Sequence, residues 1–110
     1  MKYNKVTISV VSGKPIKIIF VNDDVMAHNL LLAAPGSLND LGAAADKMAA
    51  DPKGFDKHFI PEDKRVLWAT KLLQPGQTAE LSFIAPNPGA YPYICTFPLH
   101  WKLMTGGMHV

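Results

Sequence analysis

The sequence predicts an all-β protein, a β-sandwich with one helical insertion around residues 37–50. Two observations lead to this fold class. Apolar and polar residues alternate in most of the chain, and turn-forming residues separate the alternating segments. Only the middle of the chain has the apolar spacing of an amphipathic helix. With 110 residues, 48% of them hydrophobic, the chain has the length and composition of one domain with its own core.

Three strands are expected before the helix. In the first, Val6, Ile8 and Val10 alternate with polar residues, and in the second the alternation covers residues 16–20. The turn-forming stretches "SGKP" and "NDD" follow these two segments. The third is the short apolar run "HNLLLAA" at residues 28–34, which has the pattern of a strand buried on both faces.

The helix is predicted from a stripe of apolar residues at helical spacing: Leu38, Leu41, Ala45, Met48 and Ala49. Ser37 followed by Asp40 resembles a capping box with Asp in the place of Glu. Pro52 and Gly54 are expected to stop the helix.

Strand patterns return after the helix. The alternation resumes at residues 78–83 and, after the turn "APNPG", at residues 91–95. Met108 and Val110 suggest a closing strand. The predicted order is therefore a group of strands, one helix, and a second group of strands.

Composition excludes several classes of function. The net charge of +2 is small and the basic residues are scattered, so no nucleic-acid partner is expected. No apolar stretch approaches the roughly 18 residues that a membrane span needs, and the opening "MKYNKVTISV" lacks the apolar core of a signal peptide. A single cysteine, Cys95, excludes an internal disulfide.

Three potential metal donors lie close together near the C-terminus. Cys95, His100 and Met104 fall within "CTFPLHWKLM", where Pro98 interrupts strand pairing and favours a loop that folds back. A fourth donor has to come from elsewhere, and His28, at the start of the buried apolar run, is the candidate. The other two histidines, His58 and His109, are expected to be surface residues.

The chemistry of this donor set favours copper. Thiolate and thioether are soft ligands, and two imidazoles with one thiolate and a weak thioether describe the blue-copper electron-transfer site. Structural zinc more often uses sets richer in cysteine. A Cys–His nucleophile would need an orienting third group and an oxyanion hole, which the flanks of Cys95 do not suggest. A binuclear copper centre needs a second cysteine, and a trinuclear cluster needs histidines where Ile94 and Thr96 stand.

Three stretches carry a family resemblance that covers nearly the whole chain: "VMAHNLLL", "GFDKHFIPEDKRVLWATKLLQPGQTAELSF" and "YICTFPLHWKLMTGGM". They resemble the cupredoxins of the azurin and auracyanin type. The resemblance implies a Greek-key β-sandwich, with residues 1–110 as one cupredoxin domain. It implies four copper ligands: His28, Cys95, His100 and Met104. It also suggests a weak contact from the carbonyl of Ala27, and a link between Asn29 and Thr96 that supports the site.

The sequence departs from the family pattern in three places. The family's first N-terminal strand looks absent, so the chain is expected to be a domain taken from a larger bacterial oxidoreductase-type protein. The azurin disulfide is also missing, since Cys95 is the only cysteine. Finally, Leu99 stands where the family has glycine. A negative φ is expected at Leu99, with its side chain enlarging an apolar collar around His100.

The resemblance implies one-electron transfer rather than catalysis. The edge of the His100 ring is expected to reach the surface within an apolar partner patch formed by Met26, Pro98, Leu99 and His100 itself. A cytochrome or an adjoining oxidoreductase domain would be the redox partner, and copper together with the family favours a periplasmic or other extracytoplasmic location. Two alternatives remain: a copper-handling protein, which the scattered methionines disfavour, and a cupredoxin-like interaction module without metal.

Overall fold

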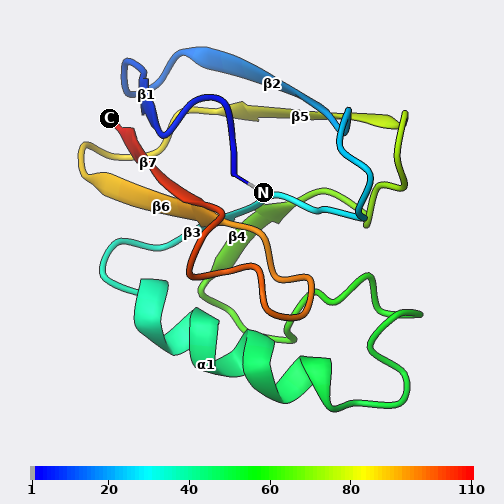
Figure 1. Ribbon diagram of the computed structural model, residues 1–110. Coiled ribbons are helices and arrows are strands. Elements are labelled where there is room, and N and C mark those ends of the chain that lie inside the picture. The colour runs from blue at the N-terminus through cyan, green and yellow to red at the C-terminus, as the bar shows by residue number, and fades with distance from the viewer. Residues whose placement is uncertain (1) are drawn as a thin grey trace.

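The protein consists of two β-sheets and one helix stacked in three layers (Figure 1). The computed structural model describes residues 2–110. The larger sheet has the strand order β1 (Thr7–Ser9), β7 (Thr105–His109), β6 (Ala90–Ile94), β3 (Leu31–Ala33) and β4 (Val66–Ala69). The smaller sheet pairs β2 (Pro15–Val21) with β5 (Thr78–Ile84), and the helix is α1 (Leu38–Ala49). The predicted β-sandwich with one helical insertion is confirmed.

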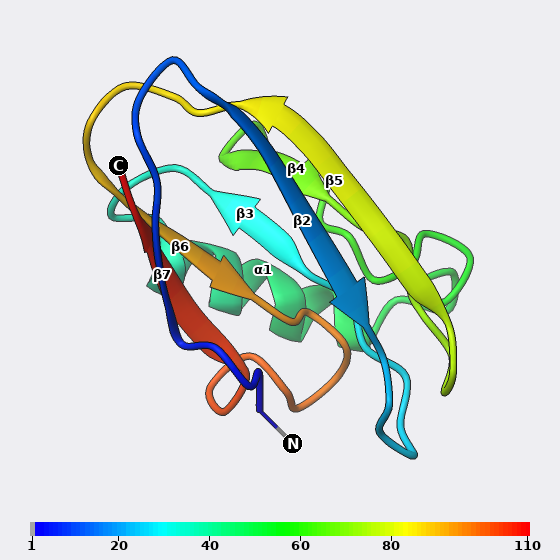
Figure 2. The ribbon, with the colours of Figure 1, turned by 90° about the horizontal axis from the view of Figure 1, so that it is seen from above.

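The smaller sheet covers one face of the larger one (Figure 2). β2 and β5 are antiparallel, with Pro15 opposite Ile84 and Val21 opposite Thr78. Because side chains alternate between the faces of a strand, Ile16, Ile18 and Phe20 all point into the space between the sheets, where they pack on the core. The alternation in the sequence therefore predicted the inward face of β2.

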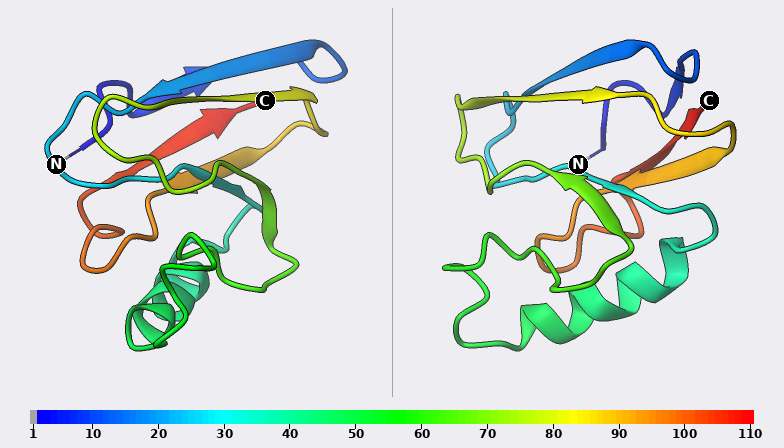
Figure 3. Two further views of the ribbon diagram at one scale, coloured as in Figure 1. Left: turned by 90° about the vertical axis from the view of Figure 1, so that its right-hand side faces the viewer. Right: turned by 180° about the vertical axis from the view of Figure 1, so that it is seen from behind.

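The larger sheet is buried on both faces in its middle (Figure 3). Tyr91 and Tyr93 of β6 belong to the core between the two sheets, and Cys95 continues on the same side. Ile94, pointing the other way, belongs to a second cluster that packs against Leu41 of α1. The prediction that the run at residues 28–34 would be buried on both faces is confirmed by β3, all of which is buried.

The helix lies where the sequence predicted it, but its N-terminus has no side-chain cap. Leu41 and Ala45 are buried, whereas Ala49 at the end of the predicted stripe is exposed. The predicted capping box is wrong, since Ser37 makes no side-chain cap hydrogen bond. Its hydroxyl turns back and donates to the carbonyl of Ala34 at 2.6 Å. Among residues 2–110, no helix is long and apolar enough to span a bilayer.

Two features of the larger sheet were not predicted. β4 has the sequence VLWA, without clean alternation of polar and apolar residues, and it pairs only with β3, across an irregular register at Leu32 and Ala33. β1 runs parallel to β7, with Ile8 opposite Met108. Near the start of β7, Gly106 leaves room for the ring of Tyr93, whose hydroxyl donates to the carbonyl of Lys5 at 2.6 Å.

We expect Gly106→Ala to destabilise the fold by about 1–3 kcal/mol, the usual cost of overpacking. The added Cβ would lie 2.4 Å from Cζ of Tyr93, and the hydroxyl bond to Lys5 limits how far that ring can move. Urea unfolding of the metal-free protein measures the change. Gly107→Ala is the matched control, because the nearest atom to its added Cβ is 3.6 Å away on the flexible His109 side chain. Equal losses in both variants would contradict the close-contact explanation.

Candidate metal centre

The structure brings three donor side chains together in a buried position. Nδ1 of His28 lies 3.9 Å from Sγ of Cys95, and Nδ1 of His100 lies 3.6 Å from the same sulfur. A donor atom from each of the three residues lies within 4.8 Å of the others. Residues 67 positions apart in the sequence thus converge on one point.

Two segments of the chain supply these side chains. His28 lies just before β3 and forms an isolated bridge with Leu73, with backbone bonds of 3.0 and 2.8 Å. Cys95 directly follows β6, and His100 lies in the loop that joins β6 to β7 (Figure 1). The loop is closed at its base, because the amide of Cys95 donates to the carbonyl of Met104 at 3.0 Å.

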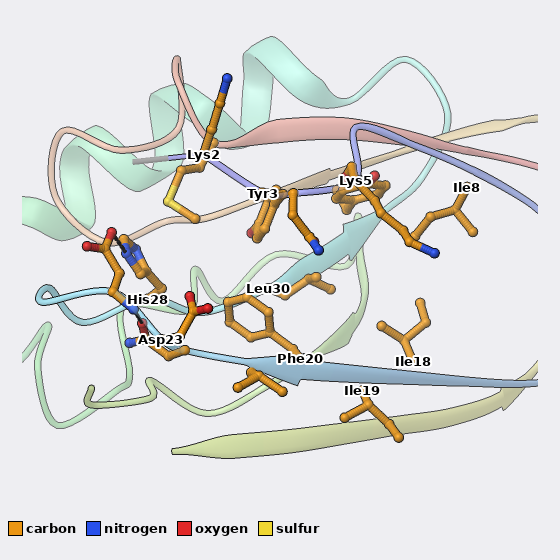
Figure 4. Close-up of a pocket in the computed structure, with 16 residues that line it drawn as sticks. Lys2, Tyr3, Lys5, Ile8, Ile18, Ile19, Phe20, Asp23, His28 and Leu30 are labelled. Atoms are coloured by element: carbon orange, nitrogen blue, oxygen red, sulfur yellow. Dashed lines mark hydrogen bonds and ion pairs between the residues drawn. The ribbon is translucent and has the colours of Figure 1, made fainter. Parts of the chain in front are cut away.

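Met104, the fourth residue of the predicted set, lies at the same site. It is buried, and its amide donates to the carbonyl of His100 at 2.8 Å. Met104 and His28 both line a cavity of about 300 Å³ between β2 and the N-terminal segment. Figure 4 shows His28 at one end of this cavity and Tyr3, Phe20 and Leu30 along it.

Asp24 determines which nitrogen of His28 is available to a metal. Its Oδ2 lies 2.8 Å from Nε2 of His28. Because a carboxylate only accepts, the proton lies on Nε2, and the lone pair of the neutral ring is on Nδ1, facing Cys95. The same hydrogen bond lowers the pKa of Asp24 below its ordinary value. Sequence reasoning missed Asp24, because its contact with His28 depends on how the loop before β3 folds.

Burial keeps the remaining donors uncharged when no cation is present. Desolvation raises the pKa of Cys95 to about 11, against opposing backbone hydrogen bonds from Asn29 and Phe97. Burial also lowers the pKa of His100, and the nearby His28 acts in the same direction. At neutral pH the site therefore presents a neutral imidazole and a thiol that a bound cation would deprotonate.

A pair of hydrogen bonds between Asn29 and Thr96 joins the two segments. Nδ2 of Asn29 donates to Oγ1 of Thr96 at 2.9 Å, and the amide of Thr96 donates to Oδ1 of Asn29 at 2.8 Å. Asn29 adjoins His28 and Thr96 adjoins Cys95. The contact expected between these two residues is therefore present, and it holds the neighbours of two donors at a fixed separation.

The segment around His58 adds two backbone carbonyls to this hydrogen-bond network. The carbonyl of His58 accepts from Nδ2 of Asn29 at 2.9 Å, and the carbonyl of Phe59 accepts from Oγ1 of Thr96 at 2.6 Å. Both residues have a positive φ, of 55° and 52°. The ring of His58 is exposed as predicted, but its Nδ1 accepts from the amide of Leu72 at 3.1 Å. Sequence reasoning missed this supporting role.

Comparison with known proteins agrees with this geometry. The family described as "Copper binding proteins, plastocyanin/azurin family" matches residues 1–110. The chain belongs to this family. Its four donor side chains, His28, Cys95, His100 and Met104, are arranged as a type 1 copper site.

Auracyanins and azurins are among its relatives. The chain is 33% identical to auracyanin-A of Chloroflexus aurantiacus over 112 residues, which is 100% of this chain and 67% of that protein. It is 36% identical to azurin-1 of Alcaligenes xylosoxydans xylosoxydans over 87 residues, or 76% of this chain and 64% of the relative. It spans 43% of auracyanin-B of C. aurantiacus, at 30% identity.

A solved structure shows the same likeness in three dimensions. The dithionite-reduced auracyanin of Roseiflexus castenholzii superimposes with a TM-score of 0.82 at 34% identity, over 99% of this chain and 86% of that one. The protein is thus an azurin- and auracyanin-like cupredoxin. Its family and the geometry of its donor set support electron transfer through a single copper centre.

The backbone at Leu99 differs from the expectation. Its φ is +70°, so the predicted negative φ is wrong. The amide of His100 donates to the carbonyl of Phe97 at 3.1 Å, which closes a turn with Pro98 and Leu99 at its centre. Proline followed by a residue of positive φ is the pattern of a type II turn, whose third position is most often occupied by glycine. The turn therefore imposes the strained conformation, while the Leu99 side chain is 87% exposed.

The His100 ring is also placed differently from the expectation. The residue is only 1% exposed, so the prediction that its edge reaches the surface is wrong. Its ring lies 4.8 Å from that of Phe97 and 5.0 Å from that of His28, measured between centroids. Within the described part of the chain, its Nε2 has no hydrogen-bond partner. Of the other residues in the predicted partner patch, Met26 and Leu99 are exposed and Pro98 is half-buried.

We expect Leu99→Gly to stabilise the metal-free protein by roughly 0.5–1 kcal/mol. A non-glycine residue in the left-handed conformation destabilises the folded state by about 1–2 kcal/mol, and glycine removes this strain. Glycine also has more freedom in the unfolded chain, which offsets the gain by about 0.5–1 kcal/mol. The exposed Leu99 side chain loses little packing. Urea unfolding measures the difference. Leu103→Gly is the control, because Leu103 is also exposed but has no positive φ and should lose stability. A loss of similar size in both variants would refute strain at Leu99.

Proposed function

We propose that His28, Cys95, His100 and Met104 ligate one copper ion, and that the protein passes single electrons between redox partners through it. The observation that carries this proposal is the convergence of two imidazole Nδ1 atoms on one buried thiol. Two imidazoles, one thiolate and a thioether suit copper in both oxidation states. Structural zinc sites are more often richer in thiolate.

Copper bound there would supply a one-electron Cu(II)/Cu(I) couple between an electron donor and an acceptor. The protein's own task is to keep the donor atoms still. The Cys95 thiol would lose its proton to solvent on binding a cation, and the backbone amides of Asn29 and Phe97, which already bond the sulfur, would stabilise the thiolate. The Asp24 carboxylate holds His28 with Nδ1 facing inward. The carbonyl of Ala27 is proposed as a weak additional contact.

The Asn29–Thr96 contact supports this rigidity. Its hydrogen bonds are buried and join the residues that follow His28 and Cys95. Buried polar groups that are fully paired favour a single arrangement, because any movement would leave them unpaired. The donors therefore need to move little when the copper changes oxidation state. We assign Asn29 and Thr96 this orienting role.

The buried position of His100 sets how a partner would approach. A partner cannot touch the ring, which is 1% exposed, and would dock on apolar side chains that lie close to His100 or His28 in the sequence. We propose Met26, Pro98 and Leu99 as this patch, with the electron crossing to His100 behind it. Weak redox complexes use small interfaces, which suits such a patch. A cytochrome or an adjoining oxidoreductase domain in an extracytoplasmic compartment is the proposed partner.

Titration of the purified protein with Cu(II) tests the proposed function. We expect an intense thiolate-to-copper charge-transfer band in the visible spectrum that saturates at about one copper per chain. The band should fade with ascorbate and return with ferricyanide. Cys95→Ser should abolish it, whereas the control His109→Ala, at an exposed position in β7, should retain it.

Other outcomes of this titration would contradict the proposal. A band that survives in Cys95→Ser would refute the ligand assignment. A colourless protein that binds only Cu(I), and exchanges it readily, would indicate copper handling. The absence of any copper binding would indicate an interaction module.

We expect Asp24→Ala to weaken copper binding about 10–100-fold, the usual effect of removing a hydrogen-bond partner from a ligating histidine. The carboxylate fixes both the ring orientation and the protonated nitrogen of His28. Competition with a chelator of known affinity measures the change. Asp23→Ala is the control, because it removes the same charge from the preceding position and leaves the hydrogen bond between His28 and Asp24 in place. Equal weakening by both variants would show a general charge effect instead.

A further inference from the structure

Trp101 lies within the copper loop and contacts the helix. It follows His100 directly and precedes Met104 by three residues. A Cβ built on Gly42 would lie 2.5 Å from each of three indole carbons, Cδ2, Cε2 and Cζ2. The indole therefore lies against the bare backbone of α1 in a space that only glycine leaves open.

A hydrogen bond fixes the indole at a second point on the same helix. Nε1 of Trp101 donates to Oδ1 of Asp46 at 3.0 Å. Gly42 and Asp46 are four residues apart, so they lie on one face of α1. Both contacts are specific to the indole, since one depends on its flat ring and the other on its N–H group. A bond to a charged acceptor is also stronger than one between neutral groups.

The indole also packs on the cluster between the helix and the larger sheet. That cluster contains Leu41 of α1 and Ile94 of β6. Ile94 is the residue before Cys95, with its side chain on the helix side of the sheet. Trp101 thus links the loop to the helix and to the end of the strand from which Cys95 follows.

The backbone of the loop would transmit any movement of Trp101 to two donors. The carbonyl of His100 accepts from the amides of Leu103 and Met104, at 3.0 and 2.8 Å, so residues 100–104 form one tight turn. Cys95 is joined to the far end of that turn by its bond to the carbonyl of Met104. A shift of the indole would therefore displace His100 and Met104 relative to Cys95.

We propose that Trp101 is a positioning residue for the copper centre, and that Gly42 and Asp46 of α1 form its seat. The indole, held on the helix, keeps His100 and Met104 in the metal-binding arrangement before copper enters and through changes of oxidation state. This inference rests on the proposed ligand set. It assigns the inserted helix a role in the function of the site beyond covering the sheet. It also accounts for a glycine in the interior of α1, where glycine is otherwise unfavourable.

The test compares variants of Trp101 and of its contact residues on α1 with a variant of a second tryptophan, Trp68, as the control. Trp101→Ala removes both contacts, Trp101→Phe keeps a ring without the N–H group, and Asp46→Ala removes only the acceptor. Trp68→Phe is the control, because Trp68 stacks on Phe83 at a centroid distance of 4.2 Å between the two sheets. For each variant, chelator competition gives the copper affinity, electron paramagnetic resonance gives the copper spectrum, and urea unfolding gives the stability of the metal-free protein.

We expect Trp101→Ala to bind copper about 10–100-fold more weakly and to show an altered copper spectrum. Trp101→Phe and Asp46→Ala should change both quantities in the same direction by smaller amounts. Gly42→Ala should reproduce the spectral change with Trp101 still present, because the added Cβ displaces the indole. Trp68→Phe should lower stability while affinity and spectrum remain those of the unmodified protein.

Unchanged affinity and spectrum in the Trp101 and Gly42 variants would overturn the inference, even if stability fell as in Trp68→Phe, since the indole would then only fill the core. If Trp101→Ala does not fold, the copper affinity and spectrum of Trp101→Phe and Asp46→Ala test the inference by the same criteria. Failure of the unmodified protein to form the coloured copper centre would overturn the proposed function and this inference together. The two failures are therefore distinguishable.

Discussion

The contact between Asn29 and Thr96 is the constraint on which the site depends. It joins residues 67 positions apart, one following His28 and the other following Cys95. The carbonyls of His58 and Phe59 accept hydrogen bonds from the remaining donors of the two side chains, the second N–H of Asn29 and the hydroxyl of Thr96. Because the network is buried and paired, shifting one segment against the other would leave several polar groups buried without a partner, each costing about 1–3 kcal/mol. The distance between the two donor segments is therefore set by the fold before a metal enters.

Backbone strain is concentrated around this network. Among the described residues, those other than glycine with a positive φ are His58, Phe59 and Leu99. The first two aim their carbonyls at Asn29 and Thr96, and the third forms the turn that leads to His100. Left-handed residues cost about 1–2 kcal/mol each and persist where the surroundings hold them in place. Here the strain is found beside the donors rather than at distant turns.

The sequence was sufficient for those features that depend on residue type and spacing. Alternation predicted β2 and β5, and the order of His28, Cys95, His100 and Met104 predicted the donors. It was insufficient where the outcome depends on tertiary contacts. β4 has no alternation and is defined only by its pairing with β3, and the burial of His100 depends on how its loop folds. Asp24 could not be assigned until the bridge between His28 and Leu73 had oriented the histidine.

The two neighbours of His100 show how one loop meets two opposite demands. Leu99 points outward and is 87% exposed, whereas Trp101 turns inward onto Gly42 and Asp46 of α1. A redox site has to be close enough to the surface for an electron to cross, yet fixed enough that its donors do not rearrange. The positive φ of Leu99 allows the chain to reverse direction within one residue of His100. That reversal lets a single turn leave the Leu99 side chain at the surface, where we propose that a partner docks, while the next indole is held on the helix.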